Sequence, residues 1–204
     1  MGLILVGLVF VLNLLISWYN ARAVGKAWVE LRDAGGGRRF MAWMGALMTG
    51  AGFTWCWLFV IGVVLIMTGK LDEEYIQLFF NVGWLVLIPV VVVSGWAITI
   101  DAWRQAYHQR TVGNFAVAGW DSFATTYNTY NAVSGMGDAL GSVIKTLSRS
   151  KEGAMVVVAL LAVGVSVGLG VITTVLLIKH YAGQEELESV AARAGRDVAE
   201  SYER

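Results

Sequence analysis

The chain has 204 residues, of which 57% are hydrophobic and 15% are charged, and its formal net charge at pH 7 is zero. A balanced charge gives no electrostatic basis for binding nucleic acid. The apolar residues gather into four runs, each near or above the roughly 20 residues that cross a bilayer core. The composition therefore excludes an ordinary soluble domain and predicts an all-α, polytopic integral membrane protein whose first partner is the lipid bilayer.

The four predicted transmembrane helices cover residues 2–19, 40–68, 75–100 and 153–178, within a membrane domain spanning residues 1–182. The first run has no positively charged segment before it, so we expect a membrane helix and not a cleaved signal peptide. Residues 183–204 carry apolar side chains at helical spacing. This last segment predicts an amphipathic C-terminal helical tail.

Lysine and arginine are concentrated in two connections, at residues 20–39 and 101–152, whereas the turn between the second and third runs holds Lys70 against three carboxylates. The positive-inside rule therefore predicts that both basic loops are cytoplasmic and that both termini lie outside. We expect a bacterial-type inner membrane or a plasma membrane. Four tryptophans lie at the predicted inner ends of the spans, where an indole can bridge lipid and water: Trp18, Trp43, Trp96 and Trp103.

The connection at residues 101–152 predicts cytoplasmic amphipathic helices. One face carries large apolar side chains at spacings typical of a helix: Trp120, Phe123, Tyr127, Tyr130, Leu140, Ile144 and Leu147. This contact face has three interpretations: it lies in the membrane interface, packs on the ends of the bundle, or meets the same helix in another copy. Its uncharged Thr and Asn flanks favour contact with protein, within or between subunits.

The string Gly135-Met136-Gly137-Asp138 resembles the Gly-x-Gly-Asp motif of intramembrane aspartyl proteases and prepilin peptidases. The resemblance covers four residues and implies a pair of aspartates that share a proton, with Asp101 as the second carboxylate. The Thr, Asn and Ser flanks depart from the family pattern, as does the lack of a basic residue soon after Asp138. We therefore interpret the glycines as a helix break, with Asp138 near the start of the next helix.

No other pattern predicts chemistry. Cys56 is the only cysteine, and His108 and His180 flank different runs, so we predict no catalytic residue, no metal and no cofactor. The interiors of the runs hold no ionisable residue, which disfavours coupled transport but permits a pore lined by amides and hydroxyls. The available polar residues are Asn13, Thr49, Thr54, Asn81, Ser94, Thr173 and Thr174.

Small residues recur every four positions in two of the runs, which lets helices approach closely in lipid. These helix-association residues are Ala42, Ala46 and Gly50 in the second run, and Ala162, Gly164, Ser166, Gly168 and Gly170 in the fourth. They can pack the helices of one subunit or join several subunits.

From these patterns we predict a non-catalytic membrane protein that self-associates into a homo-oligomer, with a pore or channel as one form of the assembly. The alternative is an accessory or structural subunit of a larger hetero-oligomeric membrane complex. An intramembrane aspartyl protease is a distant alternative.

Overall fold

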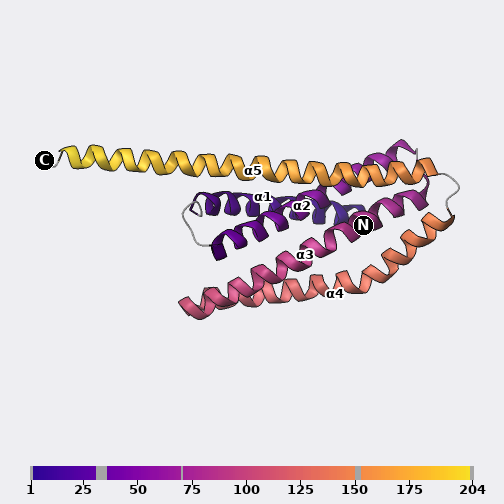
Figure 1. Ribbon diagram of the computed structural model, residues 1–204, viewed down its shortest axis with the longest axis horizontal. Coiled ribbons are helices and arrows are strands. Elements are labelled where there is room, and N and C mark those ends of the chain that lie inside the picture. Colours follow the sequence, from indigo (N-terminus) through magenta and orange to yellow (C-terminus); the bar gives the residue numbers. More distant parts are fainter. Residues whose placement is uncertain (1, 31–35, 70, 150–152, 203–204) are drawn as a thin grey trace.

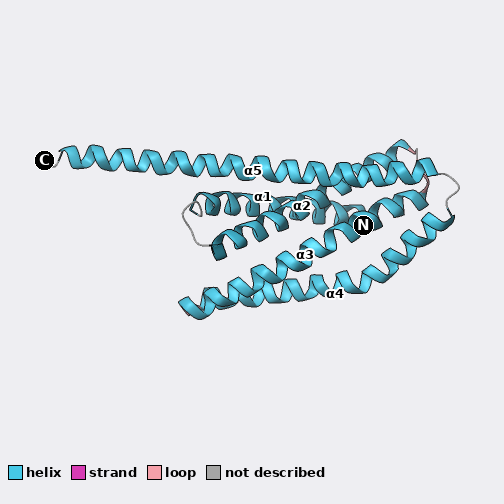
Figure 2. Ribbon diagram, viewed as in Figure 1, coloured by secondary structure: helices cyan, strands magenta, loops and turns pink. Residues whose placement is uncertain are grey.

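The computed structural model describes residues 2–30, 36–69, 71–149 and 153–202, and every regular element in this part of the chain is a helix (Figures 1 and 2). The helices are α1 (Gly2–Glu30), α2 (Gly36–Thr68), α3 (Glu73–Gln109), α4 (Val112–Arg149) and α5 (Gly153–Tyr202). By length and composition, α1, α2, α3 and α5 are able to cross a membrane. The prediction of an all-α chain with four membrane-crossing helices is confirmed to that extent.

Successive helices run in opposite directions, and local backbone chemistry sets the turns. The α2–α3 turn uses Gly69 at a φ of +59°, which a residue without Cβ adopts readily. At the other end, α3 stops where Arg110 takes a left-handed conformation and donates its backbone N–H to the carbonyl of Ala106 at 2.9 Å. We call the end of the bundle with the α2–α3 turn end A, and the end with the α3–α4 turn end B.

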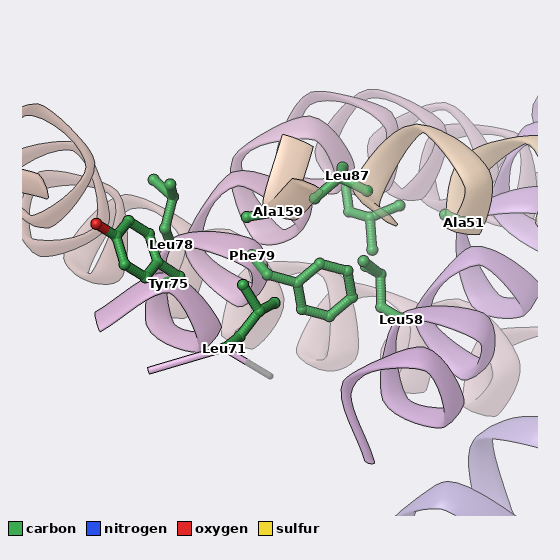
Figure 3. Packing of buried hydrophobic residues seen from close by; sticks show 9 residues of the cluster. Ala51, Leu58, Leu71, Tyr75, Leu78, Phe79, Leu87 and Ala159 are labelled. Carbon is green, nitrogen blue, oxygen red and sulfur yellow. The ribbon is translucent and has the colours of Figure 1, made fainter. Parts of the chain in front are cut away.

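A hydrophobic cluster near end A joins α2, α3 and α5 (Figure 3). Phe79 and Leu78 of α3 are fully buried and meet Leu58 of α2 and Ala159 of α5 in this cluster. Helix α2 also contacts α1 on another side, so it lies at the centre of the bundle. In lipid such packing replaces the hydrophobic drive that holds soluble helices together.

Polar side chains within the apolar helices form hydrogen bonds, either to another helix or to the backbone of their own helix. Asn13 of α1 donates to the carbonyl of Gly52 of α2 at 3.1 Å, and the indole of Trp57 donates to Thr173 of α5 at 3.1 Å. The hydroxyl of Thr49 donates a hydrogen bond to the carbonyl of Gly45 in the same helix. Within the described residues, no buried side-chain nitrogen or oxygen lacks a hydrogen-bond partner, as a medium without water requires.

Helix α4 differs from the predicted inner loop. It has 38 residues, about 57 Å at 1.5 Å per residue, and lies antiparallel beside α3 (Figure 1). The predicted helix break at Ser134–Gly137 is wrong, because α4 runs through it without interruption. Contact with α3 offsets the roughly 1 kcal/mol by which a mid-helix glycine disfavours a helix. Lys145 and Arg149 therefore lie toward end A, away from Arg104 and Arg110.

Helix α5 continues beyond the bundle at end B and includes the predicted C-terminal helix without a break (Figure 1). The extension packs closely on α1 at Gly25, because a Cβ at this position would lie 2.6 Å from Cβ of Tyr181. Lys26 and Glu185 form an ion pair at 3.2 Å beside this contact. The two termini lie toward opposite ends of the bundle, whereas the sequence predicted both on one side of the membrane; which side each end faces stays a prediction.

Candidate functional site on the outward face of α4

The inward face of α4 packs on α3 through small residues spaced seven positions apart. Five residues of α4 are buried there: Ala118, Thr125, Ala132, Ala139 and Thr146. A strict seven-residue spacing keeps one seam of a helix against its neighbour over many turns. Because these side chains are small, the two backbones lie close, and Gly95 of α3 faces Thr125. The seven-residue spacing is present in the sequence, but the large aromatic residues on another face of the helix give the stronger pattern.

Hydrogen bonds between side chains reinforce the seam near end B. The hydroxyls of Thr99 and Thr125 lie 2.9 Å apart and are buried. The indoles of Trp96 and Trp103 donate to Thr129 and Ser122 at 3.1 and 2.7 Å. These two tryptophans, expected to anchor the chain at the lipid–water boundary, thus also hold α4 against α3.

The predicted contact face points away from the bundle. The four aromatic residues are 58–70% exposed, and the three aliphatic members, Leu140, Ile144 and Leu147, are exposed as well. Neighbouring rings follow one another along the helix: Trp120 and Phe123 at 6.0 Å between centroids, and Phe123 and Tyr127 stacked at 6.3 Å. This aromatic ridge is thus preformed in one subunit, and its contact with lipid or with another protein stays a prediction.

A second line of exposed or half-buried residues runs beside the aromatic ridge. This polar stripe consists of Asn128, Asn131, Asp138, Ser142 and Lys145, at spacings that keep them on one side of a helix. Its depth follows from Gly135, where a Cβ would lie 3.8 Å from Nε1 of Trp84 on α3. Trp84 is nine residues, about 13 Å, inside the predicted span 75–100. The stripe therefore lies beside the part of α3 that the sequence predicts to cross the membrane.

The aspartates named by the Gly-x-Gly-Asp resemblance are not brought together. Asp101 lies near end B, where it accepts a hydrogen bond from Gln105 at 2.7 Å. Asp138 lies one turn beyond Gly135, which faces Trp84, and Trp84 is about 25 Å from Asp101 along α3. These two carboxylates cannot share a proton in this arrangement. In the part of the chain that the structure describes, no group of three or more His, Cys, Asp or Glu could hold a metal ion.

The small residues of α5 divide between two faces. Ser166 is fully buried, and a Cβ on Gly170 would lie 2.7 Å from both N and Cα of Thr54 on α2. Gly164 and Gly168, in contrast, have nothing within 4 Å of their Cβ positions. Ala162, Ser166 and Gly170 thus belong to the inner ridge, while Gly164 and Gly168 form a second, open one.

The small residues of α2 point into the subunit. Ala42 is 7% exposed, Ala46 is half-buried, and a Cβ on Gly50 would lie 3.7 Å from the hydroxyl of Thr174 on α5. Near Ala42, a cavity of about 410 Å³ opens at end B. It is lined by Trp28, Val29, Arg39, Ala42, Trp43, Ala182 and Glu186. Trp28 and Trp43 meet edge to face there, at 5.2 Å.

Comparison of the sequence with protein-family models, with curated proteins and with solved structures found no match. The class of the protein therefore follows from the fold alone. It is a helical protein with four helices suited to cross a membrane and a fifth, more polar helix beside them.

Proposed function

We propose that the chain is a non-catalytic subunit of a membrane homo-oligomer that forms a pore, with the outward face of α4 turned to neighbouring subunits and to the pore. The observation that carries this proposal is the polar stripe, which lies beside the predicted membrane span of α3 and exposes Asn128, Asp138 and Lys145 on the subunit surface.

Lipid is a poor neighbour for the polar stripe. A carboxylate or ammonium group at the centre of a bilayer costs about 2.5–3.5 kcal/mol in insertion experiments, which is an upper limit for a group nearer the membrane surface. Antiparallel pairing with α3 puts Asp138 one turn from Gly135 toward end A, about 9 Å inside the predicted span. Water or polar groups of another subunit would remove this cost, and acyl chains would not.

The aromatic ridge supplies a surface suited to protein contact. Tyrosine and tryptophan are enriched among the residues that dominate binding energy at protein interfaces. The ridge and the polar stripe lie side by side on α4, so a neighbouring subunit that packs on the ridge would leave the stripe at the inner border of the contact. A ring of such contacts would enclose the stripes.

Helix α5 offers the matching small surface. Gly164 and Gly168 lie in the open, four residues apart, with exposed Leu161 and Val165 beside them. Such small-xxx-small ridges let helices of different subunits approach closely, where van der Waals packing drives association. A large aromatic ridge on one subunit against a small ridge on the next gives a head-to-tail contact, which closes into a ring if the rotation permits.

The first test compares two exposed tyrosines by native mass spectrometry of the full chain in mild detergent. Tyr130 of the aromatic ridge is 70% exposed, and Tyr19 of α1 is 72% exposed. We expect the unmodified chain to give one multi-subunit mass. Tyr130→Ala should weaken self-association about tenfold, equivalent to about 1.4 kcal/mol, whereas Tyr19→Ala should leave it unchanged.

The second test measures ion flux from liposomes that contain the reconstituted chain. Flux that depends on protein concentration with a power above one would support an oligomeric pore. A chain that stays monomeric in mild detergent and in nanodiscs would refute self-association and favour the accessory-subunit alternative. An oligomer that is silent in both orientations would refute the pore.

A further inference from the structure

We infer that the path bordered by α4 conducts cations and that Asp138 selects them. This inference rests on the proposed function, and it deepens it by naming the class of ion. Along α4, residues 122–144 include only one Asp, Glu, Lys, Arg or His, and it is Asp138.

Asp138 is exposed on the subunit surface. Among the residues that the structure describes, it makes no hydrogen bond and no ion pair. Lys145, the cationic member of the polar stripe, is two helical turns from Asp138, about 10 Å along the axis. The carboxylate is therefore free to act on whatever fills the space beside α4.

In a closed ring, every subunit contributes its Asp138 at the same depth. Repeated carboxylates at one level of a narrow path favour cations over anions, as acidic rings do in cation channels. The neighbouring members of the stripe, Asn128, Asn131 and Ser142, are neutral and can hydrogen-bond water around a passing ion. They provide a wet path without a competing charge.

Charged side chains lie at both ends of α4. At end B, Asp121 and Asp101 line a cavity of about 200 Å³, and Arg104 and Arg110 lie at the same end of α3. Lys145 and Arg149 lie on α4 toward end A and are exposed. Between Asp121 and Lys145, Asp138 is the one charged side chain of α4, and this position assigns the selectivity to it.

The test measures the cation-to-anion permeability ratio from reversal potentials, with the full chain in planar bilayers under a potassium chloride gradient. We expect the unmodified chain to favour potassium roughly tenfold, the lower limit of counter-ion enrichment in a cleft of one sign. Asp138→Asn should bring the ratio close to one while conductance persists. Asp138→Glu should keep the preference, and Asp138→Lys should reverse it toward chloride.

Glu188→Gln is the matched control, since Glu188 is an exposed carboxylate on the extension of α5 and lies away from α4. It should leave the ratio unchanged. Conductance by all variants with one common ratio would overturn the assignment of Asp138 and leave the pore intact. No conductance by the unmodified chain would instead refute the proposed function, so the two failures are distinguishable.

Discussion

At the scale of single residues, two glycines of α5 have opposite surroundings and so give opposite expectations. A methyl group on Gly170 would press on the backbone of Thr54, whereas a methyl group on Gly164 would meet nothing within 4 Å. We expect Gly170→Ala to lower the free energy of unfolding in detergent by about 1–3 kcal/mol, because α2 and α5 must separate to admit it.

Gly164→Ala is the control in the same helix. It should leave unfolding unchanged or raise its free energy by up to about 1 kcal/mol, since alanine favours a helix more than glycine does. Both values are measured by reversible thermal or denaturant unfolding of the purified chain, followed by helical circular dichroism. Equal effects of the two substitutions would contradict the close α2–α5 approach.

At the scale of helices, the seam between α3 and α4 makes a second prediction. Ala132 is 3% exposed against α3, and its neighbour Val133 is 62% exposed. We expect Ala132→Leu to detach α4, at a cost of about 1–3 kcal/mol from overpacking, and Val133→Leu to have almost no effect. Hydrogen exchange of the α4 backbone measures this, because a detached helix loses protection.

If Ala132→Leu left the exchange of α4 as slow as in the unmodified chain, α4 would not be held by this seam. A uniform rise of exchange over all five helices would instead indicate that the bundle unfolds with α4. The expected pattern is a rise confined to α4 and the facing residues of α3, with α1 and α2 unaffected.

The same helix marks how far the sequence could predict the fold. The composition of the long apolar runs predicts four helices able to cross a membrane, and each predicted span begins within four residues of the observed helix. Helices α1, α3 and α5 continue well beyond the predicted ends of their spans. Helix α4 lacks such a run, because its contacts use Ala and Thr at every seventh position and its large residues face outward. Hydropathy identifies helices whose surfaces are apolar enough to face lipid. It gives no signal for a helix that packs on its neighbour through small residues and hydroxyl groups.

The candidate site was predicted in part for the same reason. Helical spacing places Trp120, Phe123, Tyr127 and Tyr130 on one face of a helix, and the use of that face as a contact surface stays a prediction. It could not tell whether that face turns toward α3 or away from it, since that depends on the partner helix. The sequence pattern does not single out the polar stripe, because three of its five members are neutral. Its position within the predicted span follows only from the contact of Gly135 with Trp84.

At the scale of the whole molecule, the path of α4 decides the topology. If α4 crosses the membrane beside α3, the chain crosses five times and the termini face opposite sides. If residues 101–152 form a loop on one side, as the basic residues predict, Val112 and Ser148 are accessible from that same side. The two arrangements therefore differ in a property that can be measured residue by residue.

Single cysteines in a Cys56→Ala background test this with a membrane-impermeant maleimide on intact cells or sealed vesicles. Suitable exposed positions are Gly37 and Val112 at end B, and Met67 and Ser148 at end A. Antiparallel helices predict that Gly37 and Val112 are labelled from one side, and that Met67 and Ser148 are labelled from the other. Labelling of Ser148 together with Val112 would show that α4 does not cross, and the polar stripe would then lie outside the bilayer.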